Sequence, residues 1–292
     1  MASMRDIKRR KGSISSTQQI TKAMKLVSTV KLQRAKQNAE KSKTYFHCMY
    51  DTVISILRKT KNLEHKYLKA GENGPKAVIV ITSNRGLAGG YNSNVTKLIT
   101  KGELAGEDLV IYAVGKKGRE ALQKHYEIKA DYSSVIEEPA YADAMVISRD
   151  VLDAFSKGEI SEIYLAYTGF KNTVVHEPVL LKLLPVDVNE ADYSDSDEQT
   201  ADGEQDKAPM NFEPEDDEAL NMLIPKYVTS LIYGGMIEAV ASENGARMQA
   251  MDSATSNAEE MIDKLTLLYN RARQGSITQE LTEIIAGANA IS

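Results

Sequence analysis

The chain has 292 residues, of which 42% are hydrophobic and 26% are charged, enough for one large domain or two modest ones with a real core. Its single cysteine, Cys48, excludes an intramolecular disulfide framework and is typical of a reducing compartment. No apolar run approaches the ~20 residues that span a bilayer, and no apolar segment follows the basic start MASMRDIKRRKGS. We therefore expect neither a transmembrane helix nor a signal peptide.

Positive charge is concentrated at the N-terminal end. Residues 1–70 hold 17 Lys and Arg against four Asp and Glu, a net charge of +13, although the whole chain carries −5. A basic arm of this kind predicts an acidic partner. Nucleic acid is the usual first candidate, but the arm has few aromatic residues and neither zinc-ligand nor helix-turn-helix spacing. We therefore do not expect nucleic-acid binding.

A long helix is predicted from about Ser3 to Leu57. This stretch contains no proline and a single glycine, Gly12. Its apolar residues recur mostly at spacings of three, four or seven, which indicates a helical stripe. The stripe consists of Ile7, Ile14, Ile20, Ala23, Met24, Val27, Val30 and Ala35. A helix of this extent reaches about 80 Å, too long for the interior of a compact domain.

Between Lys76 and Val186 the pattern changes to alternating strands and helices, which predicts a small α/β domain with a largely parallel sheet. The segment 187–218 is acidic and polar, with Lys207 its only basic residue, and is typical of a flexible loop or linker. Strands are expected at 77–82, 109–114, 126–130, 162–168 and 174–186, and helices at 92–101, 116–126 and 141–157.

A second long helix is predicted from about Glu215 to Ala290, because apolar residues keep helical spacing there and no proline follows Pro225. It could reach roughly 100 Å. Two long terminal helices around a compact domain predict an antiparallel coiled coil with the α/β domain at the side of one end. The seam mixes Met, Ala, Thr and Ser with aliphatic residues. That mixture favours a shaft whose tip sits inside a partner over a permanent zipper.

The segment SNRGLAGGYN, residues 83–92, follows the first predicted strand and precedes a helix, as a phosphate-binding loop does. A P-loop needs a lysine directly after its last glycine, but Tyr91 follows Gly90 here. A dinucleotide site needs G-x-G-x-x-G and an acidic residue after the second strand, but the glycines read G-x-x-G-G and the second strand ends in VGKKGR. We therefore expect a tight strand-to-helix turn with no bound cofactor.

No catalytic constellation is visible in the sequence. The four histidines, His47, His65, His125 and His176, are scattered without metal-ligand spacing, and no nucleophile has a partner base. We therefore expect no catalytic residue, no cofactor-binding residue and no metal site. Two alternatives stay open. One is an NADP-dependent enzyme with helical dimerisation arms, whose VGKKGR cations hold the 2′-phosphate. The other is a coiled-coil adaptor whose basic arm binds nucleic acid.

The two ends of the chain carry a specific resemblance. TQQITKAMKLVSTVKLQRA (residues 17–35) and the block from ASENGARMQAM to AGANAI (residues 241–291) resemble the gamma subunit of rotary ATP synthases. SNRGLAGGYNSN (residues 83–94) resembles the central motif of that family. The resemblance covers essentially the whole chain. It implies an antiparallel two-helix coiled coil joined to a Rossmann-like α/β domain that binds no nucleotide.

The resemblance also implies a domain division and a non-catalytic role. Residues 1–70 correspond to the N-terminal shaft helix, residues 71–210 to a foot domain that includes an acidic loop at 187–210, and residues 211–292 to the C-terminal shaft helix. The implied partners are the alpha and beta subunits of the catalytic ring, the epsilon subunit and the c-ring. Proton or sodium flow turns the c-ring, and the shaft changes the conformation of each beta subunit in turn. The implied location is the cytoplasmic face of a bacterial cell membrane, as a peripheral protein.

Particular residues match the family's motifs. Arg273 and Gln274 match an Arg-Gln pair that hydrogen-bonds a loop of beta, and Met24 matches the methionine near beta's acidic lever. The complete set expected to contact beta is Lys22, Met24, Lys25, Arg247, Arg273 and Gln274. Thr278, Gln279 and Glu280 are expected to pack against the first helix around Met24. The foot contacts with epsilon and the c-ring are expected at Tyr45, Phe212, Glu213 and Pro214.

The sequence departs from the family pattern at three places. Lys11 stands where the family usually has an aliphatic residue, so the first turns are expected to be looser or more exposed. The acidic tract at 187–206 is longer than in a minimal bacterial form. That region also lacks a cysteine pair, which argues against the thiol-controlled form of chloroplasts.

Overall fold

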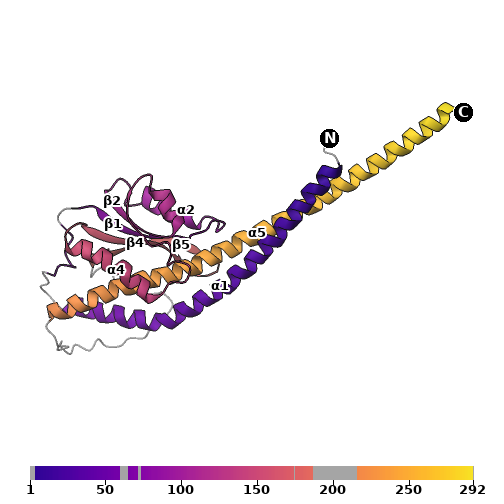
Figure 1. The fold of residues 1–292 in the computed structure, drawn as a ribbon. Coiled ribbons are helices and arrows are strands. Elements are labelled where there is room, and N and C mark those ends of the chain that lie inside the picture. Colours follow the sequence, from indigo (N-terminus) through magenta and orange to yellow (C-terminus); the bar gives the residue numbers. More distant parts are fainter. Residues whose placement is uncertain (1–3, 60–64, 72–73, 174, 187–215, 292) are drawn as a thin grey trace.

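Two long antiparallel helices and a small α/β domain make up the molecule (Figure 1). The computed structural model describes residues 4–59, 65–71, 74–173, 175–186 and 216–291. We call helices α1 and α5 the shaft and residues 76–184 the central domain. The elements are α1 (Met4–Lys59), β1 (Lys76–Ile81), α2 (Tyr91–Lys101), β2 (Leu109–Val114), α3 (Lys116–Leu122), β3 (Glu127–Asp131), α4 (Tyr141–Ser156), β4 (Glu162–Phe170), β5 (His176–Leu184) and α5 (Asp216–Ile291).

The sheet has the strand order β3-β2-β1-β4-β5. Strand β1 lies parallel to both β2 and β4, and β2 lies parallel to β3. Only β5 runs antiparallel, as the second arm of a hairpin with β4. The prediction of a largely parallel sheet is confirmed. Most element ends differ from the expected ones by one or two residues, and the largest difference is at α3, which ends at Leu122 and not at Tyr126.

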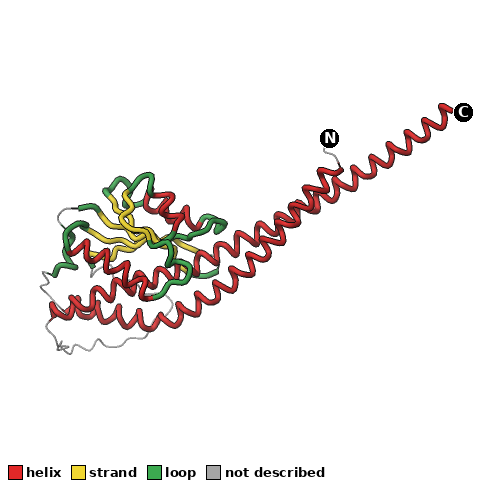
Figure 2. Tube along the Cα trace, in the orientation of Figure 1, coloured by secondary structure: helices red, strands yellow, loops and turns green. Residues whose placement is uncertain are grey.

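Helices cover both faces of the sheet, and Figure 2 shows the strands between α2 on one side and α4 with α5 on the other. Alternate residues of β1 enter the two layers, as the strand pleat requires. Val78 and Val80 pack toward α2 and α3, whereas Ile79 and Ile81 pack toward α4 and α5. The result is a three-layer α/β/α arrangement, in which the alternating pattern of the sequence places a core on each face.

The first part of α5 belongs to the core of the central domain. Its buried side chains follow one face of the helix at spacings of four, and they pack against β4, β1 and α4. They are Leu220, Ile224, Val228, Ile232 and Met236. At roughly 2 kcal/mol for each buried side chain, they contribute on the order of 10 kcal/mol. The same helix then continues without a break as one arm of the shaft, so no linker separates the shaft from the domain.

The two arms of the shaft meet along a seam with a seven-residue repeat. Ile7, Thr21, Ser28 and Ala35 of α1 are buried at multiples of seven, and Met251, Ala258 and Leu265 of α5 repeat in the same way. This is the spacing of a left-handed coiled coil. Small side chains at most of these positions make a narrow seam. None of the described helices is apolar over a length sufficient to cross a membrane.

The predicted apolar stripe of α1 is partly wrong. Ile20, Val27 and Val30 were expected in the seam, but they are 60%, 58% and 53% exposed. They lie one or two positions away from the buried heptad positions, which Thr21 and Ser28 occupy instead. The sequence pattern therefore identified an apolar face of α1 correctly. This face does not pack against α5, because it lies on the side of α1 that points away from that helix.

Two polar contacts fix the register of the shaft. The hydroxyls of Thr21 and Thr255 lie 2.8 Å apart, and Lys25 Nζ lies 2.6 Å from Asp252 Oδ1. Because the helices are antiparallel, the C-terminal end of α5 extends past the first described residue of α1 (Figure 1).

This register corrects the predicted packing of Thr278, Gln279 and Glu280 around Met24. Met24 lies within one turn of Thr21, which faces Thr255. Thr278 lies more than six turns beyond Thr255, about 35 Å further along the axis. All three side chains are exposed. The resemblance identified the segment, but it carried no information on which turn of α1 lies opposite.

Replacing Thr21 and Thr255 together by valine is expected to raise the free energy of unfolding by up to ~1 kcal/mol. The double substitution removes both hydroxyls together, so neither is left as a buried polar group without its partner across the seam. Unfolding in urea, followed by helical circular dichroism, measures the change. Thr278→Val is the control, since Thr278 is exposed and should give no change. A loss of stability in the double variant would mean that the hydroxyl pair stabilises the seam.

Candidate functional site

The first turn of α3 is capped by residues that follow β1. The N–H of Lys116 donates to Asn84 Oδ1 at 3.1 Å, and the N–H of Lys117 donates to the Ser83 carbonyl at 3.0 Å. The N–H of Gly118 donates to Thr82 Oγ1 at 2.8 Å. N–H groups in the first turn of a helix are those that hold phosphate in nucleotide-binding folds. Here these three donors are already bonded to the chain itself.

Gly115 allows this close approach of α3 to β1. Its φ is +123°, a conformation that L-side chains rarely adopt. A Cβ at this position would lie 2.0 Å from the Thr82 carbonyl oxygen. The GKKG turn after β2 is therefore a packing device against the end of β1, and the glycine is required by its backbone conformation as well as by space.

The glycine-rich loop joins β1 to α2, as predicted, and it is held by its own polar side chains. The Ser83 N–H donates to Asn92 Oδ1 at 2.9 Å, and the Ser83 hydroxyl donates to the Arg85 carbonyl at 2.6 Å. Asn92 Nδ2 donates in turn to Ser83 Oγ at 2.8 Å. At the tip of the loop, Leu87 is exposed and has a positive φ of 65°.

Arg247 connects this loop to the shaft. Its Nη2 lies 3.4 Å from the Arg85 carbonyl and 3.3 Å from the Gly86 carbonyl, and its Nη1 lies 2.7 Å from Glu243 Oε1. The Arg247 and Glu243 side chains are only 12% and 14% exposed. Burial raises the pKa of Glu243, and the neighbouring Arg247 acts against this shift. The guanidinium therefore joins the loop to α5 inside the molecule.

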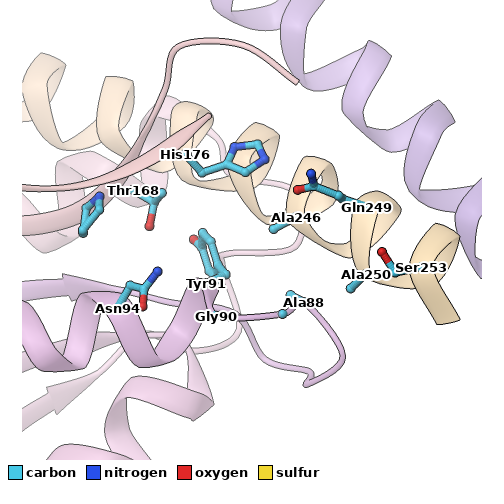
Figure 3. Close-up of a pocket in the computed structure, with 12 residues that line it drawn as sticks. Ala88, Gly90, Tyr91, Asn94, Thr168, His176, Ala246, Gln249, Ala250 and Ser253 are labelled. Carbon is cyan, nitrogen blue, oxygen red and sulfur yellow. The ribbon is translucent and has the colours of Figure 1, made fainter. Parts of the chain in front are cut away.

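A cavity of about 260 Å³ lies between the loop, the β4–β5 hairpin and the shaft (Figure 3). It lies near the carboxyl ends of β1 and β4, the place where open α/β sheets usually bind ligands. Here one wall is the shaft helix α5. The lining residues are Ala88, Gly89, Gly90, Tyr91, Asn94, Thr168, His176, Pro178, Ala246, Gln249, Ala250 and Ser253, with no Lys or Arg to balance a phosphate.

Three side chains in the cavity wall have buried polar atoms without a partner. Within the described residues, the Tyr91 hydroxyl, the Thr168 hydroxyl and both ring nitrogens of His176 have no hydrogen-bond partner of acceptable geometry. Burial raises the pKa of Tyr91 well above its usual value, with Glu243 acting in the same direction and Arg247 against it. These atoms cluster where the central domain meets the shaft.

The VGKKGR cations, which carried the NADP alternative, are largely engaged elsewhere. Arg119 pairs with Asp131, and Lys117 Nζ lies 2.7 Å from Glu120 Oε2. Across the described ranges, no group of three or more His, Cys, Asp or Glu could hold a metal ion. The geometry therefore adds no observation in favour of that alternative.

The structure spreads the other predicted contact residues along the shaft. Lys22 is exposed, Met24 is half-buried, and Lys25 is paired with Asp252. Arg273 and Gln274 are both exposed.

Among the predicted foot residues, Tyr45 alone belongs to the part of the chain that the structure describes. Tyr45 is exposed near the end of α1 that adjoins the central domain. Phe212, Glu213 and Pro214 lie outside the described residues. Sequence reasoning missed Glu243, although its place four residues before Arg247 on a helix was a visible signal for an ion pair.

Fold and site together define a class of protein: a coiled-coil shaft that shares its longer helix with the core of a Rossmann-like domain. A family model described as ATP synthase matches residues 3–291. The chain is 64% identical to the ATP synthase gamma chain of Lachnoclostridium phytofermentans, with both chains covered completely. It is 41% identical to the sodium-ion-specific ATP synthase gamma chain of Acetobacterium woodii, over 99% of both chains. The chain therefore belongs to the ATP synthase gamma-chain family.

Solved structures share the fold. A chain of the Euglena gracilis mitochondrial ATP synthase matches with a TM-score of 0.66 and 18% identity, over 99% of this chain and 94% of that one. A chain from the central stalk and c-ring of the Tetrahymena thermophila mitochondrial enzyme gives a TM-score of 0.57 and 22% identity, over 80% and 99%. The predicted fold class, an antiparallel two-helix shaft with a central Rossmann-like domain, is confirmed.

Proposed function

We propose that the chain is the central rotor stalk of an ion-translocating ATP synthase, which couples rotation of a c-ring to sequential conformational change in catalytic beta subunits. The observation that carries this proposal is the continuity of α5, which is a core layer of the central domain and then an arm of the shaft. Torque applied to the domain reaches the tip of the shaft through one packed helix.

The work that ion transport delivers must pass from the central domain to the shaft, which requires a continuous, well-packed connection such as α5. One charge that crosses 100 mV supplies about 2.3 kcal/mol, so several ions contribute to each ATP. Their combined work must pass through the junction of domain and shaft without unfolding it. The buried face of α5 and the Arg247 contact to the loop supply the cohesion at this junction.

The surface of the shaft fits a surrounding ring of subunits. Ile20, Leu26, Val27 and Val30 on α1 are exposed, and so are Ile277, Leu281 and Ile284 on the part of α5 beyond α1. Contiguous exposed apolar residues mark interaction surfaces. We assign these surfaces to the alpha and beta subunits. The contacts to beta are assigned to Lys22, Met24, Lys25, Arg247, Arg273 and Gln274, although the Arg247 side chain is only 12% exposed in the free chain.

The opposite end is assigned to the membrane side of the assembly. Tyr45 with Phe212, Glu213 and Pro214 is proposed to contact the epsilon subunit and the c-ring. In this division residues 1–70 and 211–292 form the shaft helices and residues 71–210 the foot domain. The proposed location is peripheral, on the cytoplasmic face of the cell membrane.

Co-expression of the chain with alpha and beta subunits tests the proposal. The expected result is a stable complex with ATPase activity that the chain alone lacks. Failure to form an active complex, when the alpha and beta subunits are themselves folded, would contradict the rotor function. Saturable NADP binding by the isolated chain would support the enzyme alternative, and nucleic-acid binding that weakens steeply with salt would support the adaptor alternative.

The double substitution Arg273→Ala with Gln274→Leu is expected to lower ATP turnover of the assembled complex roughly tenfold. Removing hydrogen bonds to beta at about 1.4 kcal/mol in total produces that factor. Turnover of the purified complex at saturating ATP measures it. Arg271→Ala is the matched control, because it removes an exposed arginine two residues away on another face of the same helix. Turnover equal to that control would mean that the pair transmits no torque.

A further inference from the structure

The end of the β4–β5 hairpin is attached to α5 at three points. Ser242 Oγ donates to the Gly169 carbonyl at 3.1 Å, and the Phe170 N–H lies 3.4 Å from Glu238 Oε2. The third point is His176, the partner of Phe170 in the strand register. The Phe170 and His176 rings lie 6.0 Å apart between centroids.

His176 occupies the space that a side chain at position 245 would need. A Cβ on Gly245 would lie 2.6 Å from His176 Cε1 and 3.1 Å from its Nε2. Figure 3 shows the ring reaching from the hairpin toward α5, close to Ala246 and Gln249. The imidazole is thus in van der Waals contact with the backbone of the shaft and separates the hairpin from the helix at this point.

Charged groups around this contact are already engaged. On the hairpin, Lys171 pairs with Glu177 at 2.8 Å, and on α5 Glu238 faces the Phe170 N–H while Glu243 pairs with Arg247. From α1, Lys36 Nζ lies 5.1 Å from the centroid of the Phe170 ring. No free carboxylate among these groups is available to pair with a protonated imidazole.

We propose that His176 is a positioning residue, whose neutral ring fills the space left by Gly245 and sets the separation of the central domain from the shaft. A protonated ring needs hydrogen-bond acceptors or a counter-charge, but both ring nitrogens lack a hydrogen-bond partner here and the nearby carboxylates of Glu177 and Glu243 are already in ion pairs. Protonation therefore loosens the hairpin from α5, while the core face of α5 nearer the N-terminal end of that helix stays packed.

The direction of the titration agrees with the geometry. Burial lowers the pKa of His176 below its usual value of 6.5, with the Thr173 carbonyl acting in the opposite direction. A histidine with a lowered pKa in the folded state binds protons less readily than in the unfolded state. Its contribution to stability is therefore present above pH 6.5 and is lost as the pH falls through 6.5 toward the lower folded-state pKa.

Distance measurement between two spin labels in the purified full chain tests the proposal. Cys48→Ser removes the native thiol, and Val175→Cys with Ser256→Cys places labels on the hairpin and on the shaft, both at exposed positions that leave the Lys171–Glu177 pair intact. We expect a narrow distance distribution at about pH 7.5 that broadens at about pH 5.5, a pH below the ordinary imidazole pKa of about 6.5. His176→Gln should stay narrow at both values, and His176→Lys should be broad at both.

Two matched controls separate positioning from general packing. His125→Gln removes an exposed histidine and should keep the broadening of the parent. Gly245→Ala should broaden the distribution at both pH values, whereas Gly275→Ala, which has open space around its Cβ, should not. A parent distribution that is unchanged between the two pH values, or broadening that persists in His176→Gln, would overturn the proposal.

A functional measurement adds to the structural one. The number of ions transported per ATP hydrolysed, in vesicles that hold the whole ATP synthase, should fall at about pH 5.5 in the parent more than in His176→Gln. This measurement rests on the proposed rotor function, whereas the label distance does not. An unchanged ratio of ions to ATP together with a pH-dependent label distance would therefore contradict an effect of His176 on coupling, but not its positioning role.

Discussion

Gly115→Ala is expected to lower the free energy of unfolding by about 2–6 kcal/mol, the sum of backbone strain and overpacking. The backbone at φ +123° is strained for any L-side chain, which costs on the order of 1–3 kcal/mol. The added Cβ would also lie 2.0 Å from the Thr82 carbonyl oxygen. Thr82 cannot move freely, because its N–H bonds the Val114 carbonyl and its hydroxyl accepts from Gly118. Overpacking therefore adds a further ~1–3 kcal/mol.

Urea unfolding of the purified variant measures this loss, and the yield of soluble protein reports a complete failure to fold. Gly158→Ala is the matched control. Gly158 also has a positive φ, +72°, but a Cβ there meets nothing within 4 Å, so only backbone strain of about 1 kcal/mol is expected. If Gly115→Ala and Gly158→Ala lower the free energy of unfolding by the same amount, the close packing of α3 on the end of β1 does not contribute to the requirement for glycine at position 115.

Local pattern was sufficient to predict the elements and the fold class. Strands such as Leu109–Val114 are continuous apolar runs, and a strand buried on both faces has this pattern in a parallel sheet. Helix α1 contains no proline and α5 contains none after Pro225, and the lengths of the two helices alone exclude a compact interior. These features depend on residues that are close together in the sequence, so the amino-acid sequence alone is sufficient to predict them.

The contacts of the shaft depend on what lies outside the chain, and the pattern failed there. Ile20, Val27 and Val30 form a regular apolar row, yet Thr21 and Ser28 take the buried seam. Periodicity detects an apolar face but does not say which partner covers it. An obligate subunit has two kinds of apolar face, one for itself and one for its assembly. The misplacement of Thr278, Gln279 and Glu280 has a related cause, because helix register is set by pairs such as Thr21 and Thr255.

The glycine-rich loop shows the same division. Spacing alone excluded a P-loop and a dinucleotide fingerprint, since both chemistries require fixed positions for a few residues. The contacts that the loop makes with α3 and with Arg247 could not be predicted, because they are tertiary contacts between residues far apart in the sequence. Thr82, Ser83 and Asn84 cap a helix more than 30 residues away, and Arg247 reaches the loop from the other end of the chain.

Arg247→Met is expected to lower the free energy of unfolding by about 3 kcal/mol at neutral pH. The substitution keeps most of the apolar length of the side chain but leaves the Glu243 carboxylate buried without its partner. The carbonyls of Arg85 and Gly86 lose their guanidinium donor as well. Combining Arg247→Met with Glu243→Gln should recover most of the loss, because the buried charge is then removed together with its counter-charge.

The loss should depend on pH in one direction. Burial raises the pKa of Glu243 in the folded protein, and removal of Arg247, which opposes that shift, raises this pKa further. A carboxyl group with a raised folded-state pKa binds a proton more readily in the folded than in the unfolded chain, so stability falls as the pH rises above about 4.5. The cost of Arg247→Met is therefore largest at neutral pH and diminishes as the pH falls.

Unfolding of the parent, Arg247→Met and the double variant between about pH 5 and pH 8 measures this dependence, and Arg273→Met, at an exposed position, is the control with an expected change near zero. A loss that is independent of pH and is not recovered by Glu243→Gln would assign the effect to the two carbonyl contacts. The loop at 85–86 would then be joined to the shaft by hydrogen bonds alone, with no contribution from the ion pair.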